Sequence, residues 1–152
     1  MSSFVYVTYI RTTPEKLWAA LISAEFQKQY WFGMYQECDW KEGSPWKMCF
    51  PDGRVADAGE VLEVDPPRRL VLKWRNEFRP EMKAEGHSRC VYELEQAGDA
   101  VKFTVTHTID RTPSKFIEAV SGGWPKVLAG LKSYLETDIP LKGIHETCQA
   151  RE

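Results

Sequence analysis

The sequence has no long apolar run, no excess of basic residues and no closely spaced pair of cysteines. Its longest apolar run, residues 17–22, is far shorter than the roughly 20 residues that span a bilayer. No basic segment followed by an apolar one stands at the amino terminus, so we expect a cytoplasmic protein without a signal peptide or a membrane partner. With 20 basic against 22 acidic residues and a net charge of −2, it also lacks the positive field typical of nucleic-acid binding.

Cysteines and histidines are few and widely separated. The cysteines are Cys38, Cys49, Cys90 and Cys148, and the histidines are His87, His107 and His145. None of these spacings matches a zinc or iron site or the disulfide framework of a small secreted domain. We therefore predict free thiols, no metal and no cofactor. The strand pattern places Cys90 on a buried face, where a thiol is normally inert, and Cys49 on an exposed face.

The length of 152 residues fits one domain. A chain of this size buries roughly 68–70% of the surface that its unfolded form exposes, so it needs no disulfide or metal to fold. Apolar periodicity ends near residue 136, and Pro140 and Gly143 follow. We predict a single domain over residues 1–136 and a loosely attached tail over residues 137–152.

Seven segments have the composition of β-strands and are separated by turn residues. They span about residues 4–11, 36–41, 45–50, 54–64, 68–75, 87–96 and 100–109. Most alternate apolar and polar side chains; Phe103 and Val105, for example, flank Thr104. This alternation predicts an antiparallel sheet with one buried face. Residues 76–86 contain charges and Pro80, and are predicted to form a loop.

Helical spacing occurs in three places. One helix begins after Thr13, which can cap it, with Pro14 in the first helical position. A short second helix is predicted at residues 24–31, and a long apolar stripe runs from Phe116 to Leu135. Residues 122–125 are predicted to break or kink the last helix, because Pro125 cannot donate a helical hydrogen bond. The economical way to bury both apolar faces is an α+β fold, with a curved antiparallel sheet wrapped around the long C-terminal helix.

Three segments carry a resemblance to a known family. They are residues 13–21, residues 59–71, and residues 122–125 followed by Leu128, Leu131 and Leu135. In this order they resemble the activator of heat-shock protein 90 ATPase homologue 1-like family, of the START-like or SRPBCC superfamily, over residues 4–136. The resemblance implies the helix-grip fold and a deep hydrophobic cavity between the sheet and the long helix. Members of the superfamily use that cavity for lipids, sterols, polyketides and other apolar molecules, and single-domain members of this kind are bacterial.

One set of inward-facing side chains is predicted to line such a cavity. The set is Trp46, Met48, Phe50, Trp74, Tyr92, Phe103, His107, Trp124 and Leu128. These large side chains either contact a ligand or simply fill the space between sheet and helix, and both interpretations stay open. His107 likewise either orients a polar group of a ligand or is a hydrogen-bonded histidine in a dry core.

These observations lead to one main hypothesis and two alternatives. The main hypothesis is a protein that binds a small apolar molecule as its partner. The first alternative is a cyclase, dehydratase or hydrolase that uses His107, Tyr92 or Glu60 as an acid or base. The second is a protein that stimulates a chaperone ATPase. The eukaryotic activator has a separate domain with an Asn-x-Trp-His-Trp element, and its absence from this sequence argues against a chaperone partner. A homodimer is left open.

Overall fold

A computed structural model describes residues 1–144 of the protein. His145, Cys148 and the end of the predicted tail, residues 145–152, lie outside the described residues. The strands are β1 (Ser2–Ile10), β2 (Tyr35–Cys38), β3 (Pro45–Cys49), β4 (Val55–Asp65), β5 (Arg69–Asn76), β6 (Ser88–Ala97) and β7 (Ala100–Ile109). The helices are α1 (Pro14–Ile22), α2 (Ala24–Tyr30), α3 (Pro80–Lys83) and α4 (Lys115–Thr137).

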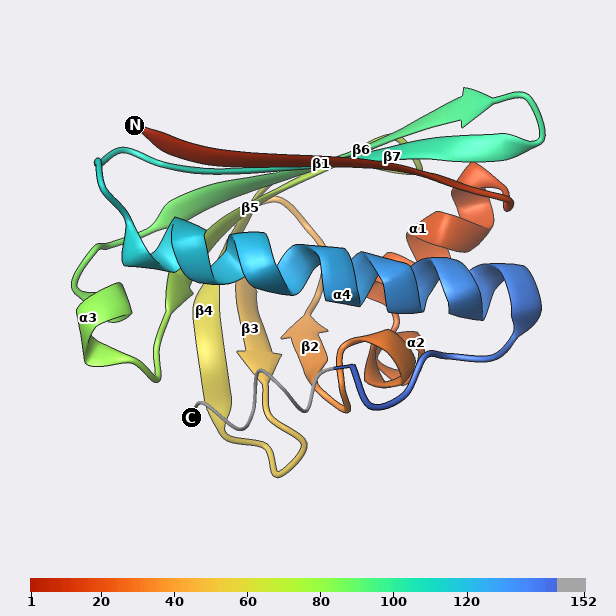
Figure 1. Ribbon diagram of the computed structural model, residues 1–152. Helices are drawn as coiled ribbons and strands as arrows, with labels where there is room; N and C mark the ends of the chain where they lie inside the picture. Colours follow the sequence, from red (N-terminus) through yellow and green to blue (C-terminus); the bar gives the residue numbers. More distant parts are fainter. Residues whose placement is uncertain (145–152) are drawn as a thin grey trace.

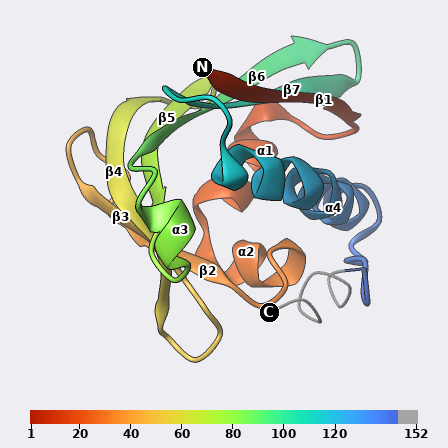
Figure 2. The same ribbon diagram turned by 60° about the vertical axis from the view of Figure 1, so that its left-hand side comes forward.

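The strands form one antiparallel sheet in the order β1-β7-β6-β5-β4-β3-β2. The first and last strands of the chain therefore lie side by side, with Phe4 opposite His107. The sheet curves around α4 (Figures 1 and 2), and α2 lies against the same helix. The predicted α+β architecture, a curved antiparallel sheet around a long C-terminal helix, is confirmed.

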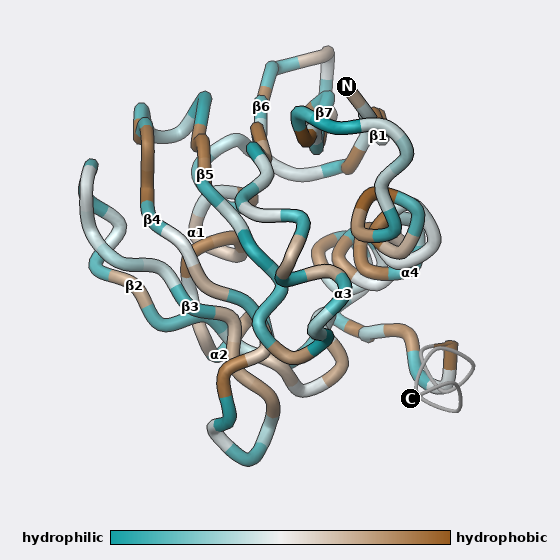
Figure 3. Tube along the Cα trace, turned by 90° about the vertical axis from the view of Figure 1, so that its left-hand side faces the viewer, coloured by the Kyte–Doolittle hydropathy of each residue, from teal (hydrophilic) through white to brown (hydrophobic). Residues whose placement is uncertain are grey.

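The helix α4 supplies the apolar stripe that the sheet buries. Its buried side chains include Phe116, Ile117, Trp124, Val127, Leu128 and Leu131. Figure 3 views α4 nearly along its axis and shows it inside the curve of the strands. At its start, Ser114 Oγ accepts a hydrogen bond from the backbone N–H of Ile117 at 3.0 Å, which satisfies one of the free donors of the first turn.

The predicted break at residues 122–125 is wrong, because α4 runs without interruption through Pro125. Proline in a helix removes one backbone hydrogen bond and crowds the preceding turn. Trp124, Val127 and Leu128 flank the proline and are at most 3% exposed. Their burial against the sheet outweighs the local cost, since tertiary packing rather than intrinsic propensity supplies most helical stability.

Two other local predictions are also corrected. The segment at residues 76–86 is not all loop, because it contains the short helix α3, which starts at Pro80 where the missing N–H costs nothing. Cys49 is buried rather than exposed, at 1% exposure. A register shift between Met48 and Cys49 breaks the simple alternation of β3 and turns the thiol inward.

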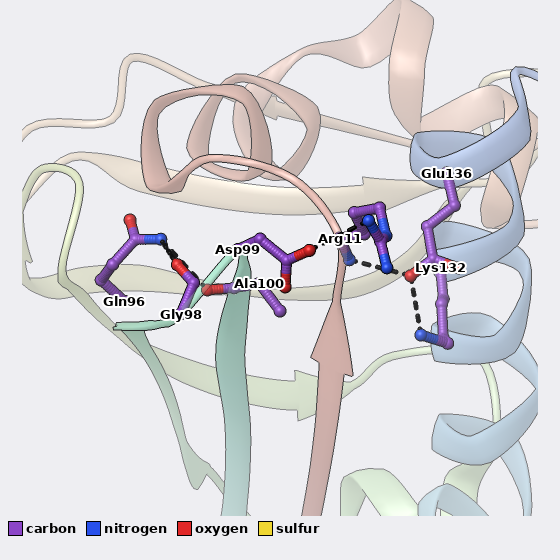
Figure 4. A network of polar contacts seen from close by, with 7 residues as sticks. All are labelled: Arg11, Gln96, Gly98, Asp99, Ala100, Lys132 and Glu136. Carbon is purple, nitrogen blue, oxygen red and sulfur yellow. Dashed lines mark hydrogen bonds and ion pairs between the residues drawn. The ribbon is translucent and has the colours of Figure 1, made fainter.

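A polar network fixes the end of α4 to the end of β1 (Figure 4). The backbone N–H of Arg11 donates to Glu136 Oε2 at 2.8 Å, and Lys132 Nζ donates to the same oxygen at 2.7 Å. These bonds lower the pKa of the Glu136 carboxyl. Arg11 also pairs with Asp99 in the β6–β7 turn at 2.9 Å. The second half of α4 is therefore held in place by polar contacts as well as by its apolar face.

Candidate functional site

A pocket of about 780 Å³ lies between the sheet and the first half of α4. Strands β3, β4 and β5 provide one wall, and residues 115–127 of α4 provide the opposite wall. Residues 31–34 after α2 and residues 78–82 around α3 complete its lining. Most of the lining is aromatic or aliphatic, with a few polar groups among them. This composition and size are typical of small-molecule sites.

Four of the predicted site residues line this pocket: Met48, Phe50, Trp74 and Trp124. The other five are buried outside the lining: Trp46, Tyr92, Phe103, His107 and Leu128. Strand alternation puts the sheet residues of both groups on the inner side of the fold, and helical spacing does the same for Trp124 and Leu128 on α4. The positions of α4 and of the connecting segments decide which of these side chains are fully packed in the core and which border the pocket.

Tryptophan rings make up the back of the pocket. The ring of Trp74 lies 4.5 Å from that of Trp46 and 5.8 Å from that of Trp124, measured between centroids. Trp31 adds an edge-to-face contact with Trp124 at 5.4 Å. Tilted and edge-to-face pairs at these distances are the favourable arrangements for aromatic rings. The result is a rigid aromatic wall that offers ring faces and edges to an apolar molecule.

His107 stands behind this wall, where both of its ring nitrogens are occupied. Trp124 Nε1 donates to His107 Nδ1 at 3.1 Å, and His107 Nε2 lies 2.8 Å from the hydroxyl of Ser88. That hydroxyl donates to the backbone carbonyl of Trp74 at 2.7 Å. Because Nδ1 accepts, the proton of the neutral ring sits on Nε2 and is donated to Ser88. His107 thus links α4 to β5 and β6.

We expect His107 to remain neutral at all pH values above about 4. Burial lowers its pKa to about 3, whereas in the unfolded chain it titrates near 6.5. The unfolded state therefore binds the extra proton first, so this residue reduces stability by up to about 4 kcal/mol as the pH falls from 6.5 towards 3. Imidazole ¹⁵N chemical shifts recorded from pH 8 to pH 4 should show one unchanging Nε2–H tautomer. A titration of His107 near pH 6.5 would contradict this assignment.

The pocket also contains a small polar group that the sequence interpretation did not identify: Asp57 on β4 with Trp74 and Asn76 on β5. Asp57 is 8% exposed and Asn76 is 6% exposed. They face each other across the two strands, and Trp74 lies two residues along β5 from Asn76, opposite Gly59. Burial raises the pKa of the Asp57 carboxyl to about 7; the nearby Trp74 N–H lowers it in part, and the charge of Glu77 raises it further.

A signal for Asp57 is present in the sequence, because it shares its strand parity with Val61, which is fully buried. An acidic residue on the inward parity of a strand is unusual enough to mark a site. Trp31 gave no comparable signal. It follows the last turn of α2, and only the fold brings it to Trp124.

Charged side chains stand at the edge of the pocket, and Glu85 holds that edge together. Arg79, Lys115, Glu118 and Lys126 contribute to the lining. Glu85 Oε1 accepts from the Ser114 hydroxyl at 2.6 Å, and its Oε2 accepts from the backbone N–H of Lys115 at 2.8 Å. Although partial burial raises its pKa, these hydrogen bonds lower it more, so the pKa of Glu85 lies below its ordinary value. Glu85 ties the loop after α3 to the start of α4.

The remaining acid–base candidates lie away from the pocket lining. Glu60 is partly exposed and pairs with Lys73 at 4.0 Å. Tyr92 is buried, which raises its pKa well above the ordinary value, and the nearby Cys90 and Tyr30 contribute.

Over residues 1–144 no three His, Cys, Asp or Glu side chains are grouped so that they could hold a metal ion. Within the same residues, no helix combines the length and apolarity that crossing a membrane would take.

The curved sheet, the long helix it encloses and the hollow between them define a helix-grip protein of the START-like, or SRPBCC, class. The chain belongs to the family described as activator of Hsp90 ATPase homolog 1-like proteins, whose sequence profile matches residues 11–136. The family assignment made from the sequence is confirmed. No curated protein matches the sequence.

Solved structures with the same fold have low sequence identity. A crystal structure of a protein from Mesorhizobium loti has a TM-score of 0.76 at 20% identity, covering 88% of this chain and 96% of that one. The solution structure of the Aha1 dimer from Colwellia psychrerythraea gives 0.74 at 20% identity, over 94% and 100%. An HSP90 activator from Plasmodium falciparum gives 0.70 at 22% identity, over 88% and 95%. At such identities the likeness extends to the fold alone.

Proposed function

We propose that this protein binds a small, mainly apolar molecule in the pocket between the sheet and α4. The observation that carries the proposal is a hollow of about 780 Å³, lined largely by aromatic and aliphatic side chains, in a domain whose neighbouring core is packed. Ligand pockets commonly measure about 300–1,000 Å³. Each 100 Å² of apolar ligand surface removed from water would contribute about 2.5 kcal/mol before the costs of association.

In this proposal the predicted site residues play two roles. Met48, Phe50, Trp74 and Trp124 contact the ligand directly, since they line the pocket. The five residues behind them hold these side chains in place: Trp46, Tyr92, Phe103, His107 and Leu128. The contact of Trp46 with Trp74 and the bond from Trp124 to His107 support this second role, because they restrain the two tryptophans of the wall.

Filling the pocket from α4 should weaken binding. Gly123 lines the pocket, and a Cβ at this position would meet no atom within 4 Å, so Gly123→Phe can place a ring in the hollow. We expect it to weaken binding of 2-isopropylnaphthalene, an apolar probe, by at least about tenfold, equivalent to about 1.4 kcal/mol. The measurement is the change in tryptophan fluorescence on titration with the probe.

Ala129→Phe provides the matched control. Ala129 lies on the same helix and is exposed, and it is outside the pocket lining. Its binding curve should match that of the unmodified protein. If the probe fails to bind the unmodified protein, or binds Gly123→Phe equally well, the proposed pocket is not a ligand site. Native mass spectrometry of the purified protein, searching for a bound small molecule, tests the proposal without a chosen probe.

An enzyme acting on an apolar substrate in the same pocket is a second candidate. The observation in its favour is Asp57, a buried acid in the pocket whose pKa is raised by burial to about 7, within the useful range for proton transfer. Turnover of aromatic polyketide-like or ester substrates that is lost in Asp57→Asn would support it.

Stimulation of a chaperone ATPase is a third hypothesis, because one similar structure is an HSP90 activator. The ATPase rate of the cognate chaperone, with and without this protein, decides it.

Self-association and location are the remaining parts of the proposal. One similar structure is a dimer, and β1 is an edge strand on which Val5, Val7 and Tyr9 are 56%, 44% and 53% exposed. We suggest that two copies pair through this strand, which sedimentation velocity would detect. The free thiols Cys38, Cys49 and Cys90 support a reducing compartment such as the cytoplasm.

A further inference from the structure

The indole N–H of Trp74 is a buried donor that finds no acceptor among the described residues 1–144. Trp74 is 3% exposed, and its Nε1 has no hydrogen-bond partner in this part of the chain although the residue lines the pocket. The Asp57 carboxyl is near enough to this N–H for each to affect the other, but the pair does not have the geometry of a hydrogen bond. A buried donor without a partner is costly, so native proteins rarely keep one without a ligand or water to accept from it.

Two neighbouring groups complete a small polar surface on the same wall. Asn76 Oδ1 accepts from the backbone N–H of Arg79 at 2.9 Å, which fixes the amide orientation and leaves its NH₂ group as a donor. Asn76 and Asp57 both line the pocket, as Trp74 does. Asp57 and Asn76 are opposite each other in the register of β4 and β5, and Trp74 is their neighbour on the same face of the sheet.

We propose that Trp74, Asn76 and Asp57 together bind a carbonyl oxygen, so that the ligand is an apolar molecule with a ketone, ester or amide group at its inner end. This inference rests on the proposed function, because it assigns the polar end of a ligand in the same pocket. A carbonyl oxygen has two lone pairs, which match the two N–H donors. The aromatic wall then takes the apolar remainder of the molecule.

The protonation of Asp57 favours a neutral carbonyl over an anionic head group. Burial, assisted by the charge of Glu77, holds its pKa near 7, so a large fraction of the carboxyl is uncharged at neutral pH and does not repel a carbonyl oxygen. Arg79, Lys115, Glu118 and Lys126 also line the pocket, from α4 and the segment around α3. A ligand carboxylate at the inner wall would lie beside a carboxyl that is itself partly ionised, which is unfavourable.

A pair of probes of similar size tests the inference. The ketone 2-acetylnaphthalene carries the carbonyl, and 2-isopropylnaphthalene has a methyl group in place of its oxygen. We expect the protein to bind the ketone about tenfold more tightly. Trp74→Phe keeps an aromatic ring but removes the N–H, so the preference should fall to about threefold or less, while 2-isopropylnaphthalene still binds.

Trp18→Phe is the matched control, because Trp18 is also buried but lies on α1, outside the pocket lining. It should retain the full preference for the ketone. A second readout needs no substitution: the Nε1 proton resonance of Trp74 should move downfield with the ketone and not with the hydrocarbon.

The outcomes separate the two proposals. If both probes bind equally, or if Trp74→Phe keeps the preference, the carbonyl site is overturned and the apolar pocket stands. An unmoved Trp74 resonance on saturation with the ketone has the same meaning. If neither probe binds the unmodified protein, the proposed function fails, and the carbonyl site fails with it.

Discussion

Gly59→Ala is expected to destabilise the protein by more than about 3 kcal/mol. A Cβ at Gly59 would lie 1.7 Å from the backbone oxygen of Lys73 and 2.5 Å from its carbonyl carbon. These are backbone atoms of the paired strand β5, so a change of side-chain rotamer cannot relieve the clash. Strands β4 and β5 would have to separate next to Trp74, which is opposite Gly59 in the register. Urea unfolding followed by tryptophan fluorescence measures the loss.

The matched control replaces another glycine. Gly122 lies within α4, and a Cβ there would meet no atom within 4 Å. Because alanine favours a helix more than glycine does, Gly122→Ala should stabilise the protein by about 0.5–1 kcal/mol. Equal midpoints for Gly59→Ala and the unmodified protein would show that β4 and β5 do not approach each other as closely as the structure has them.

Asp57→Asn is expected to stabilise the protein at pH 8. It should also remove most of the loss of folding stability that Asp57 causes as the pH rises from about 4 to 7. The Asp57 carboxyl has a pKa of about 7 in the folded protein, compared with 3.8 ordinarily. The folded state therefore holds a proton that the unfolded state has released, so the contribution of Asp57 is most favourable below pH 4. It falls by up to about 4 kcal/mol as the pH rises through 7. The asparagine side chain has no charge to bury, and it avoids this loss.

Unfolding in urea at pH 5, 6, 7 and 8 tests this expectation. Asp99→Asn serves as the control, because the side chain of Asp99 is 75% exposed and pairs with Arg11 on the surface. The stability of Asp57→Asn relative to the unmodified protein should rise from pH 5 to pH 7 and level off by pH 8, and that of Asp99→Asn should show no such rise. A constant difference for Asp57→Asn would mean that the carboxyl is ionised throughout this range.

Asp57 and His107 should have opposite effects on the pH profile of stability. Between pH 4 and pH 6.5, acidification costs stability through His107 and restores it through Asp57, since one group is buried without its proton and the other with it. The two slopes largely cancel in the unmodified protein. The profile of Asp57→Asn should therefore fall more steeply on acidification, because the effect of His107 is then uncompensated.

The strands and the main helices could be predicted from the sequence because they depend on local periodicity, and the family was identified from the resemblance of three segments. Side chains alternate along a strand and recur every three to four residues along a helix, so burial of one face leaves a pattern that can be seen without coordinates. The helix cap at Thr13 is a local device of the same kind, and its hydroxyl accepts from Lys16 at 3.2 Å as expected. The same periodicity identified the inward faces of β3, β5, β6 and β7.

The local rules failed where distant contacts compete with them. Pro125 should break a helix, but the burial of Trp124 and Leu128 against the sheet holds α4 together. Cys49 has the parity of an exposed residue, but the irregular pairing of β3 with β4 turns it inward. In both cases the deciding energy comes from residues far away in the chain.

The sequence by itself determined most of the residues that face inward, since in a regular element the inward face depends only on its period. Only the tertiary structure decided which of them surround a hollow. Met48 and Trp74 border it, whereas Trp46 and Phe103, on the same side of the sheet, are fully packed. The difference arises because α4 and the segments around Trp31 and α3 cover one region closely and leave another open, and contacts between distant segments set their positions.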